Sequence, residues 1–477
     1  MKIKLLRYLL IAAISSCAWL LTGCNNNDDT DEQSEAIAGR ATIESYQLQD
    51  EVSVDQLPNF RVQDLGFGTD NAMPGAAQGA WDFIHNTLKK YVTYVWVDSY
   101  SIDYHTITLR NGRWVKQIVS GRFLVPRALN PFDNYSIPVV ALQHPTQTER
   151  SQSPSIVAWN GDNELTVPFA YLLAYMGYAV IVPDYPGLGK NTDPHPYCIH
   201  TISNSVEDAI KTVTSSVGIK DFWPTFPTKV KWDGRIFMMG YSEGGYATMV
   251  TARVLQDQKI TVAGVAVLDA PLSLSDTMRN VMLRKDVPPD EINETPYFMP
   301  YVIAGYEDFY KNSDPAVHDF DFETVIKTAV PGYNGNFAKD LYKMLNGDYN
   351  GGQISAFMKK ATPYEGPQSV LTESFLKKLQ QTEISQNPYK ALVQNDAYYG
   401  WKPAMPMMLA HNINDDAVPV GNTDNAVKAF SGLSNVQVQK FKDALPELGT
   451  IHAGALPYAY IRGIEWIDAI AYPERHK

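Results

Sequence analysis

Two patterns of hydrophobic residues alternate along the middle of the chain. Short continuous apolar runs are typical of strands buried on both faces, and apolar residues recurring every three or four positions are typical of helices. The predicted strands are Pro138–Leu142, Tyr178–Val182, Arg235–Met239, Val262–Leu268, Met405–Ala410 and Val436–Phe441. The predicted helices are Leu165–Met176, Ser205–Val217, Gly244–Leu255 and Tyr458–Ile470. This alternation predicts an α/β protein with a mostly parallel sheet covered by helices on both faces.

An antiparallel hairpin is predicted just before this alternation, over residues 104–126. Its two arms, His105–Leu109 and Lys116–Val119, flank Asn111-Gly112. Asn-Gly is the dipeptide favoured in two-residue hairpin turns.

The strand rhythm stops between residues 273 and 401, which contain helix-like stretches such as Phe375–Gln381 and many aromatic residues. An insertion late in a parallel sheet is expected to cover the carboxyl ends of the strands, where ligands bind in such sheets. We therefore expect a mainly helical cap over residues 273–401, between two core segments at residues 59–272 and 402–477. A second structural domain is the alternative.

Residues 1–23 have the pattern of a secretory signal peptide. Three basic residues within the first seven lead into an apolar run that extends to Leu21. The run ends in Leu21-Thr22-Gly23-Cys24, which resembles the lipobox of bacterial lipoproteins, where the cysteine is acylated and cleavage falls just before it. A transmembrane anchor is the alternative, and the run is near the lower end of spanning length.

Residues 24–58 are predicted to be a disordered tether, because Asn25–Glu35 is polar, acidic and poor in core-forming residues. An acidic run after the lipidated cysteine resembles surface-export signals of some bacterial groups, with a plain solvated spacer as the alternative. We expect a lipid-anchored protein of the bacterial cell envelope, held at the outer membrane by acyl chains on Cys24 and facing the periplasm or the surface.

Composition and motifs exclude several kinds of site and partner. The net charge is −12, and removal of residues 1–23 takes three cations and no anions with it, which leaves −15. Such acidity argues against nucleic acid and anionic membrane surfaces as partners. With Cys17 in the signal and Cys24 acylated, Cys198 is expected to be a small buried residue, with a catalytic thiol as the alternative. No His-Glu-x-x-His and no Cys/His cluster occurs, so neither a metal ion nor a cofactor is expected.

The motif that carries chemistry is Gly240-Tyr241-Ser242-Glu243-Gly244, the only Gly-x-Ser-x-Gly in the chain. It follows a predicted strand and precedes a predicted helix, which is the setting of a nucleophile elbow. The flanking glycines permit a tight turn, and the Glu243 N–H at a helix N-terminus can stabilise an oxyanion. Ser242 is therefore the candidate nucleophile and Glu243 a candidate oxyanion-hole donor, with a structural turn serine as the alternative.

A serine hydroxyl needs a general base, and the base needs an orienting acid. The elbow fold places them in the chain order Ser, acid, His. Beyond the late strand only His452 and His476 remain, and His476 is expected to fray as the penultimate residue. His452 is the candidate base, in a predicted loop at Gly449–Gly454 just before the last helix, where a mobile and exposed imidazole is expected.

The acid is expected just after the strand that ends at Ala410. The segment His411–Pro419 resembles the His-Gly-x-x-Asp-x-x-Val-Pro segment of many α/β-hydrolases, and its first residue is expected to pack the turn. Asp415 occupies the position of the acid, with Asp416 and Asp424 as alternatives.

A second oxyanion donor normally comes from the loop after an early strand, here Gln143–Gln147. Pro145 has no N–H and cannot donate. Thr146 is favoured, with Gln147 as the alternative.

Several segments together resemble the secretory lipase family, known from fungi and bacteria. They are Val119–Pro126, Gly177–Gly189, His195–Tyr197, Gly240–Gly245 and the segments around Asp415 and His452. The resemblance spans roughly residues 100–270 and 400–470. It implies an α/β-hydrolase fold with a helical cap and hydrolysis of carboxylic esters without a cofactor. It further implies that Asp184 and His195–Tyr197 shape the loop beside the pocket.

The sequence thus predicts a lipase or esterase that cleaves a small-molecule ester or a lipid through Ser242, His452 and Asp415 and an acyl-enzyme. A serine peptidase or aminoacyl-amidase of the same fold is one alternative. A non-catalytic surface lipoprotein that binds a ligand is the other.

Overall fold

The computed structural model describes residues 39–53, 88, 91–94, 96–110, 113–127, 135–158, 166–215, 223, 230–284, 296–310, 320–361 and 364–477. The expected signal segment and Cys24 lie outside these residues. Within them, no helix combines the length and the apolar character needed to cross a membrane.

One sheet of nine strands runs through the described residues, in the order β1-β2-β3-β5-β4-β6-β7-β8-β9. The strands are β1 (Ile43–Ser53), β2 (Trp96–Arg110), β3 (Arg113–Pro126), β4 (Tyr135–Gln143), β5 (Ala179–Pro183), β6 (Val230–Tyr241), β7 (Gly264–Leu268), β8 (Met407–Asn412) and β9 (Val436–Phe441). From β1 to β5 in this order the neighbours are antiparallel, and from β5 to β9 they are parallel. The predicted hairpin is confirmed, since β2 and β3 pair from Arg110 and Arg113 outward.

Strand β1 lies inside the segment expected to be a disordered tether, so that expectation is wrong for residues 43–53. Most β1 residues are exposed, and Val52 is a buried exception. The strand is held by its backbone pairing with β2 rather than by an apolar face. It therefore leaves no hydrophobic period in the sequence.

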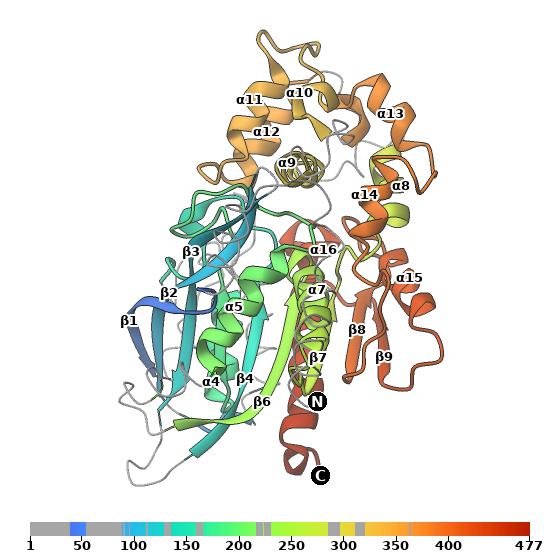
Figure 1. Ribbon diagram of the computed structural model, residues 1–477. Coiled ribbons are helices and arrows are strands. Elements are labelled where there is room, and N and C mark those ends of the chain that lie inside the picture. The colour runs from blue at the N-terminus through green and yellow to red at the C-terminus, as the bar shows by residue number, and fades with distance from the viewer. Residues whose placement is uncertain are drawn as a thin grey trace, which may run out of the picture.

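Helices cover both faces of the sheet (Figure 1). They are α4 (Thr166–Tyr175), α5 (Ile202–Thr214), α7 (Glu243–Asp257), α15 (Gly421–Ala429) and α16 (Ile451–Ala471). Alternate β4 side chains point to opposite cores: Val139 and Ala141 join the cluster of α5 and α7, and Val140 and Leu142 join that of α4 and α16. Strands β5 and β7 are consequently buried at every position. This arrangement is the α/β-hydrolase fold.

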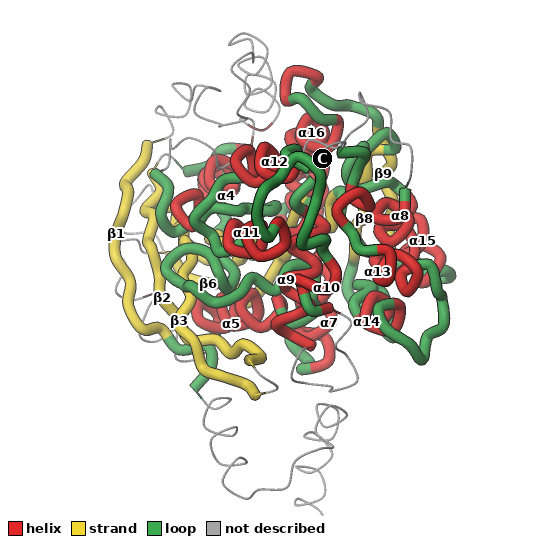
Figure 2. The backbone as a smooth tube through the Cα atoms, turned by 90° about the horizontal axis from the view of Figure 1, so that it is seen from above, coloured by secondary structure: helices red, strands yellow, loops and turns green. Residues whose placement is uncertain are grey.

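Residues 273–401 run between β7 and β8 and are mainly helical where they are described. Their helices are a π-helix (Leu274–Met278), α8 (Arg279–Leu283), α9 (Phe298–Tyr310), α10 (Phe322–Val325), α11 (Phe337–Met344), α12 (Gly351–Met358), α13 (Glu373–Leu379) and α14 (Tyr389–Gln394). Short 3-10 turns cover Arg150–Gln152, Pro367–Val370, Pro446–Leu448 and Pro473–His476. Figure 2 shows α9, α11 and α12 lying over the end of the sheet and its helix layers.

The last helix begins seven residues earlier than predicted, at Ile451 rather than Tyr458. Pro457 lies inside it, and a proline within a helical pattern normally indicates a boundary. Two polar side chains start the helix earlier: Thr450 accepts the Ala453 N–H, and the Asp416 carboxylate accepts the N–H groups of Ile451 and His452.

Candidate active site

Ser242 lies in the turn between β6 and α7, with φ 57° and ψ −124°. A non-glycine residue at positive φ is strained, and such strain collects at functional sites. A Cβ at Gly240 would collide with the Gly244 carbonyl, and one at Gly244 with the Gln143 carbonyl. The elbow thus needs both glycines to bring β6, α7 and the end of β4 this close together.

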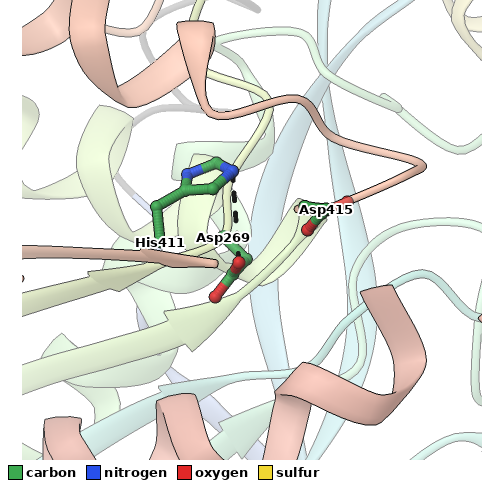
Figure 3. Close-up of side chains that lie close together, drawn as sticks. All are labelled: Asp269, His411 and Asp415. Atoms are coloured by element: carbon green, nitrogen blue, oxygen red, sulfur yellow. Dashed lines mark ion pairs between the residues drawn. The ribbon is translucent and has the colours of Figure 1, made fainter. Parts of the chain in front are cut away.

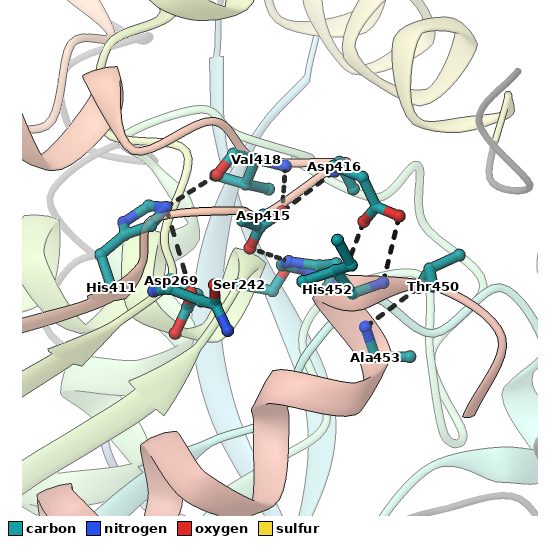
Figure 4. A network of polar contacts seen from close by, with 12 residues as sticks. Ser242, Asp269, His411, Asp415, Asp416, Val418, Thr450, His452 and Ala453 are labelled. Atoms are coloured by element: carbon teal, nitrogen blue, oxygen red, sulfur yellow. Dashed lines mark hydrogen bonds and ion pairs between the residues drawn. The ribbon is translucent and has the colours of Figure 1, made fainter. Parts of the chain in front are cut away.

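The structure brings the three side chains chosen from the sequence into one hydrogen-bonded row (Figure 4). His452 Nε2 lies 2.9 Å from Ser242 Oγ, and His452 Nδ1 lies 2.6 Å from Asp415 Oδ2. A carboxylate only accepts, so Nδ1 donates, and Nε2 is left to accept the serine proton. This is the geometry that a general base and its orienting acid require.

The expectation that His452 is mobile and exposed is wrong. The residue is 8% exposed and belongs to the first turn of α16. Its backbone is fixed at both ends, because its N–H donates to Asp416 Oδ1 at 2.9 Å and its carbonyl accepts the Tyr241 hydroxyl at 2.5 Å. The imidazole is therefore held in place before any substrate arrives.

The three candidate acids have separate environments. The second carboxylate oxygen of Asp415 accepts the N–H groups of Ala417 and Val418 at 2.9 and 2.7 Å. Burial raises the pKa of Asp415, but His452 and these hydrogen bonds outweigh it, and the net shift is downward. Asp416 holds the start of α16, and Asp424 pairs with Lys440 on the surface at 2.6 Å.

Asp269, which the sequence prediction missed, lies beside Asp415 (Figure 3). It directly follows β7 and is fully buried, and its Oδ1 accepts the Asn412 N–H at 2.7 Å. Burial and the neighbouring Asp415 carboxylate raise its pKa well above the ordinary range. Two adjacent carboxyls do not both ionise, so Asp269 stays protonated and Asp415 carries the charge. Its position just after a buried parallel strand was the signal that could have found it.

His411 completes this cluster: one ligand atom each of Asp269, His411 and Asp415 lies within 4.8 Å of the others. Its Nε2 faces the Val418 carbonyl at 2.7 Å and its Nδ1 faces the Thr423 hydroxyl at 2.8 Å. Both ring nitrogens are engaged, so His411 packs the turn and offers no free lone pair to a metal ion. Burial lowers its pKa, which keeps the ring neutral.

The two predicted oxyanion donors have different surroundings. Glu243 is the first residue of α7, and no side chain caps that helix end. The Thr146 hydroxyl lies 3.0 Å from the Tyr197 hydroxyl, and Thr146 is not among the residues that line the pocket beside Ser242. The role of the Thr146 N–H therefore stays a prediction.

A pocket of about 620 Å³, partly continuous with solvent, opens at Ser242. Its polar lining is small, and most of its wall comes from apolar side chains of residues 274–302. They are Leu274, Met278, Val281, Met282, Pro296, Phe298, Met299 and Val302.

The loop after β5 forms another part of this wall through Tyr197 and Cys198. Cys198 is buried, as expected, and burial raises the pKa of its thiol well above the ordinary range. Asp184 is buried at the start of the loop, where it accepts the Ser120 hydroxyl at 2.6 Å and the Ser155 N–H at 2.9 Å. Asp184 therefore shapes the loop and does not face the pocket.

Comparisons with known proteins agree with this fold. Solved structures similar to the chain include a putative hydrolase from Legionella pneumophila subsp. pneumophila str. Philadelphia 1 (20% identity, 91% of this chain and 99% of that chain covered, TM-score 0.66). They also include the rice cell wall degrading esterase LipA from Xanthomonas oryzae (20% identity, 91% and 99% covered, TM-score 0.64). No curated protein sequence matches the chain. Residues 163–281, which contain Ser242 and its elbow, match the family model described as Secretory lipase.

Proposed function

We propose that this protein is a serine hydrolase that cleaves carboxylic esters, as a lipase or esterase. The observation that carries the proposal is the row Asp415–His452–Ser242, with contacts of 2.6 and 2.9 Å, whose serine lines an apolar pocket. The match of residues 163–281 to the secretory lipase family supports the same chemistry.

The reaction follows from the donors and acceptors of this row. His452 Nε2 takes the hydroxyl proton as Ser242 Oγ attacks the ester carbonyl carbon. Asp415 stabilises the resulting imidazolium through Nδ1–H, and the Glu243 N–H donates to the oxyanion. The imidazolium then protonates the departing alcohol, which leaves an acyl group on Ser242. His452 next activates a water molecule that hydrolyses the acyl-enzyme.

The pocket supports an apolar acyl group as the part of the substrate that is bound. Its methionines are flexible and adapt to chains of different shape. We propose that residues 273–401 act as a cap that supplies most of this wall. Outer-membrane anchoring through acylated Cys24 also stays a proposal, carried by the sequence alone.

The test compares Ser242→Ala with Ser203→Ala on p-nitrophenyl esters of graded chain length. Ser203 is a buried serine in α5 whose hydroxyl donates to the His200 carbonyl. We expect kcat to fall by at least about 10⁴-fold in Ser242→Ala and to be unchanged in Ser203→Ala. Wild-type activity in Ser242→Ala would exclude the proposal, and faster cleavage of aminoacyl amides than of esters would favour a peptidase.

A further inference from the structure

A second histidine–carboxylate pair lies buried at the elbow. His195 Nε2 is 2.6 Å from Glu243 Oε1, and the two side chains are 5% and 0% exposed. The other Glu243 oxygen, Oε2, has no hydrogen-bond partner among the described residues. A buried carboxylate is unfavourable unless it is paired, so the stability of this one depends on His195.

The contacts of His195 favour a cation. Its Nδ1 lies 2.9 Å from the Pro186 carbonyl, which can only accept, and its Nε2 faces the Glu243 carboxylate. With Glu243 ionised, both nitrogens donate, which an imidazole does only when it is protonated. Burial lowers the pKa of His195, but Glu243 and the two hydrogen bonds outweigh it and the net shift is upward.

The ring of His195 is also held from the side. Tyr185 stacks on it with centroids 5.9 Å apart, and Tyr301 of α9 meets it edge-on at 6.3 Å. Helix α9 packs directly on the loop, since a Cβ at Gly305 would lie 3.0 Å from the His195 carbonyl oxygen. His195 is thus a rigid support for whatever it pairs with.

What it pairs with is the residue that supplies the oxyanion donor. Glu243 follows Ser242 directly, and its N–H points from the first turn of α7. An unpaired carboxylate on this residue would oppose the negative charge that develops on the substrate oxygen. The positive charge of His195 cancels that field and fixes the side chain of the same residue.

We propose that His195 is a positioning residue, which through its buried ion pair with Glu243 fixes the oxyanion donor and neutralises the carboxylate beside it. The inference rests on the proposed ester hydrolysis. His195 contacts no reacting atom, so its effect should appear in the transition state: kcat should change, and KM should not.

The experiment measures kcat and KM on p-nitrophenyl butyrate, per active site titrated with a fluorophosphonate, together with the rate of phosphonylation. We expect His195→Ala to lower kcat and the phosphonylation rate about 10–100-fold, with KM changed less than about threefold. His195→Gln keeps a hydrogen-bond donor but carries no charge, so its kcat should lie between those of His195→Ala and wild type. The double variant His195→Gln/Glu243→Gln has no buried charge at this position, and its kcat should recover to within about fivefold of wild type.

His476→Gln is the matched control, because His476 also pairs with a buried carboxylate, Asp468, at 3.0 Å, but near the C-terminus. It should leave kcat and phosphonylation unchanged. A purely structural role of His195 would lower the titrated fraction and Tm but not kcat per titrated site. That result, in His195→Ala or, if it fails to fold, in His195→Gln, would overturn the inference.

The two proposals fail separately. If Ser242→Ala abolishes ester cleavage while the His195 variants keep wild-type kcat, only the inference about His195 is lost. If wild type cleaves no ester but is still phosphonylated, the ester proposal is lost and the phosphonylation rates decide on His195. If wild type reacts with neither, both are lost.

Discussion

Two histidine–carboxylate pairs flank Ser242, and they differ in chemistry although their contact distances are the same. His452–Asp415 and His195–Glu243 each join a ring nitrogen to a carboxylate oxygen at 2.6 Å, and all four residues are buried. Neither the distance nor the burial therefore distinguishes a base from a fixed charge.

The third partner of each ring makes the difference. The free nitrogen of His452 faces the Ser242 hydroxyl, which can give up a proton, so this ring works as an acceptor. The other nitrogen of His195 faces the Pro186 carbonyl, which has no proton to give, so this nitrogen donates, and beside an ionised Glu243 the ring donates twice. A histidine beside a carboxylate is a base only where its other nitrogen meets a donor.

The largest expected effect belongs to His452. His452→Ala removes the base, so Ser242 loses its proton acceptor and kcat should fall by about 10⁴–10⁶-fold. The fall should exceed that of His195→Ala by at least about 100-fold. Both are measured on p-nitrophenyl butyrate, with near-ultraviolet circular dichroism as the check on folding. Equal losses in the two variants would remove the distinction between base and support.

Asp415→Asn should follow, with kcat lower by about 10⁴-fold, because an asparagine amide favours the wrong imidazole tautomer. The neighbouring Asp269→Asn should stay within about tenfold of wild type, since Asp269 already is neutral and an amide has nearly its shape. A larger loss in Asp269→Asn than in Asp415→Asn would reverse the assignment of the acid.

The sequence alone named the three residues of this site, because the patterns that indicate them are local or follow from the order of the residues along the chain. Ser242 is identified by its glycines and by the strand and helix around it. His452 follows from its order after a late strand, and Asp415 follows from the resemblance of its segment to the His-Gly-x-x-Asp-x-x-Val-Pro motif. Continuous apolar runs also predicted β5, β7 and β8, because strands buried on both faces leave a pattern that does not depend on their neighbours.

What the sequence missed depends on contacts between distant segments. In the sequence, Glu243 cannot be distinguished from a solvated residue at the start of a helix. Its partner His195 lies 48 positions away and reaches it only through the fold. Strand β1 has no apolar face and depends on pairing with β2. The early start of α16 depends on Asp416, which lies 35 residues before the N–H group it accepts at Ile451.

Asp416→Ala tests that last contact and should act mainly on stability. It removes a carboxylate that accepts two N–H groups at a helix N-terminus, an interaction worth about 1–2 kcal/mol. We expect the free energy of unfolding in guanidinium to fall by this amount, and kcat to fall only a few-fold as His452 loosens. Asp424→Asn is the control: it breaks an exposed pair with Lys440 and should cost less than about 0.5 kcal/mol. Similar values for both variants would mean that Asp416 does not anchor α16.

The smallest effect concerns the pH dependence of stability at Asp269. Because its pKa is raised in the folded protein, the fold retains a proton that the unfolded chain releases above about pH 3.9. Its contribution to stability is fully present below that pH and is lost as the pH rises toward the folded pKa. The lowered pKa of Asp415 acts below the same pH, outside this window.

Asp269→Asn cannot ionise and does not suffer this loss. The difference in Tm between the variant and wild type should therefore increase by about 2 °C or more from pH 4 to pH 8, in favour of the variant. A stability change on the order of 1 kcal/mol produces such a shift in a large domain. Differential scanning fluorimetry across the range measures it, with Ser203→Ala as a control that should run parallel to wild type. A constant difference between Asp269→Asn and wild type would mean that Asp269 is ionised beside Asp415. The negative charge orienting His452 would then be shared between two carboxylates, and Asp415 would lose its distinction as the single acid of the site.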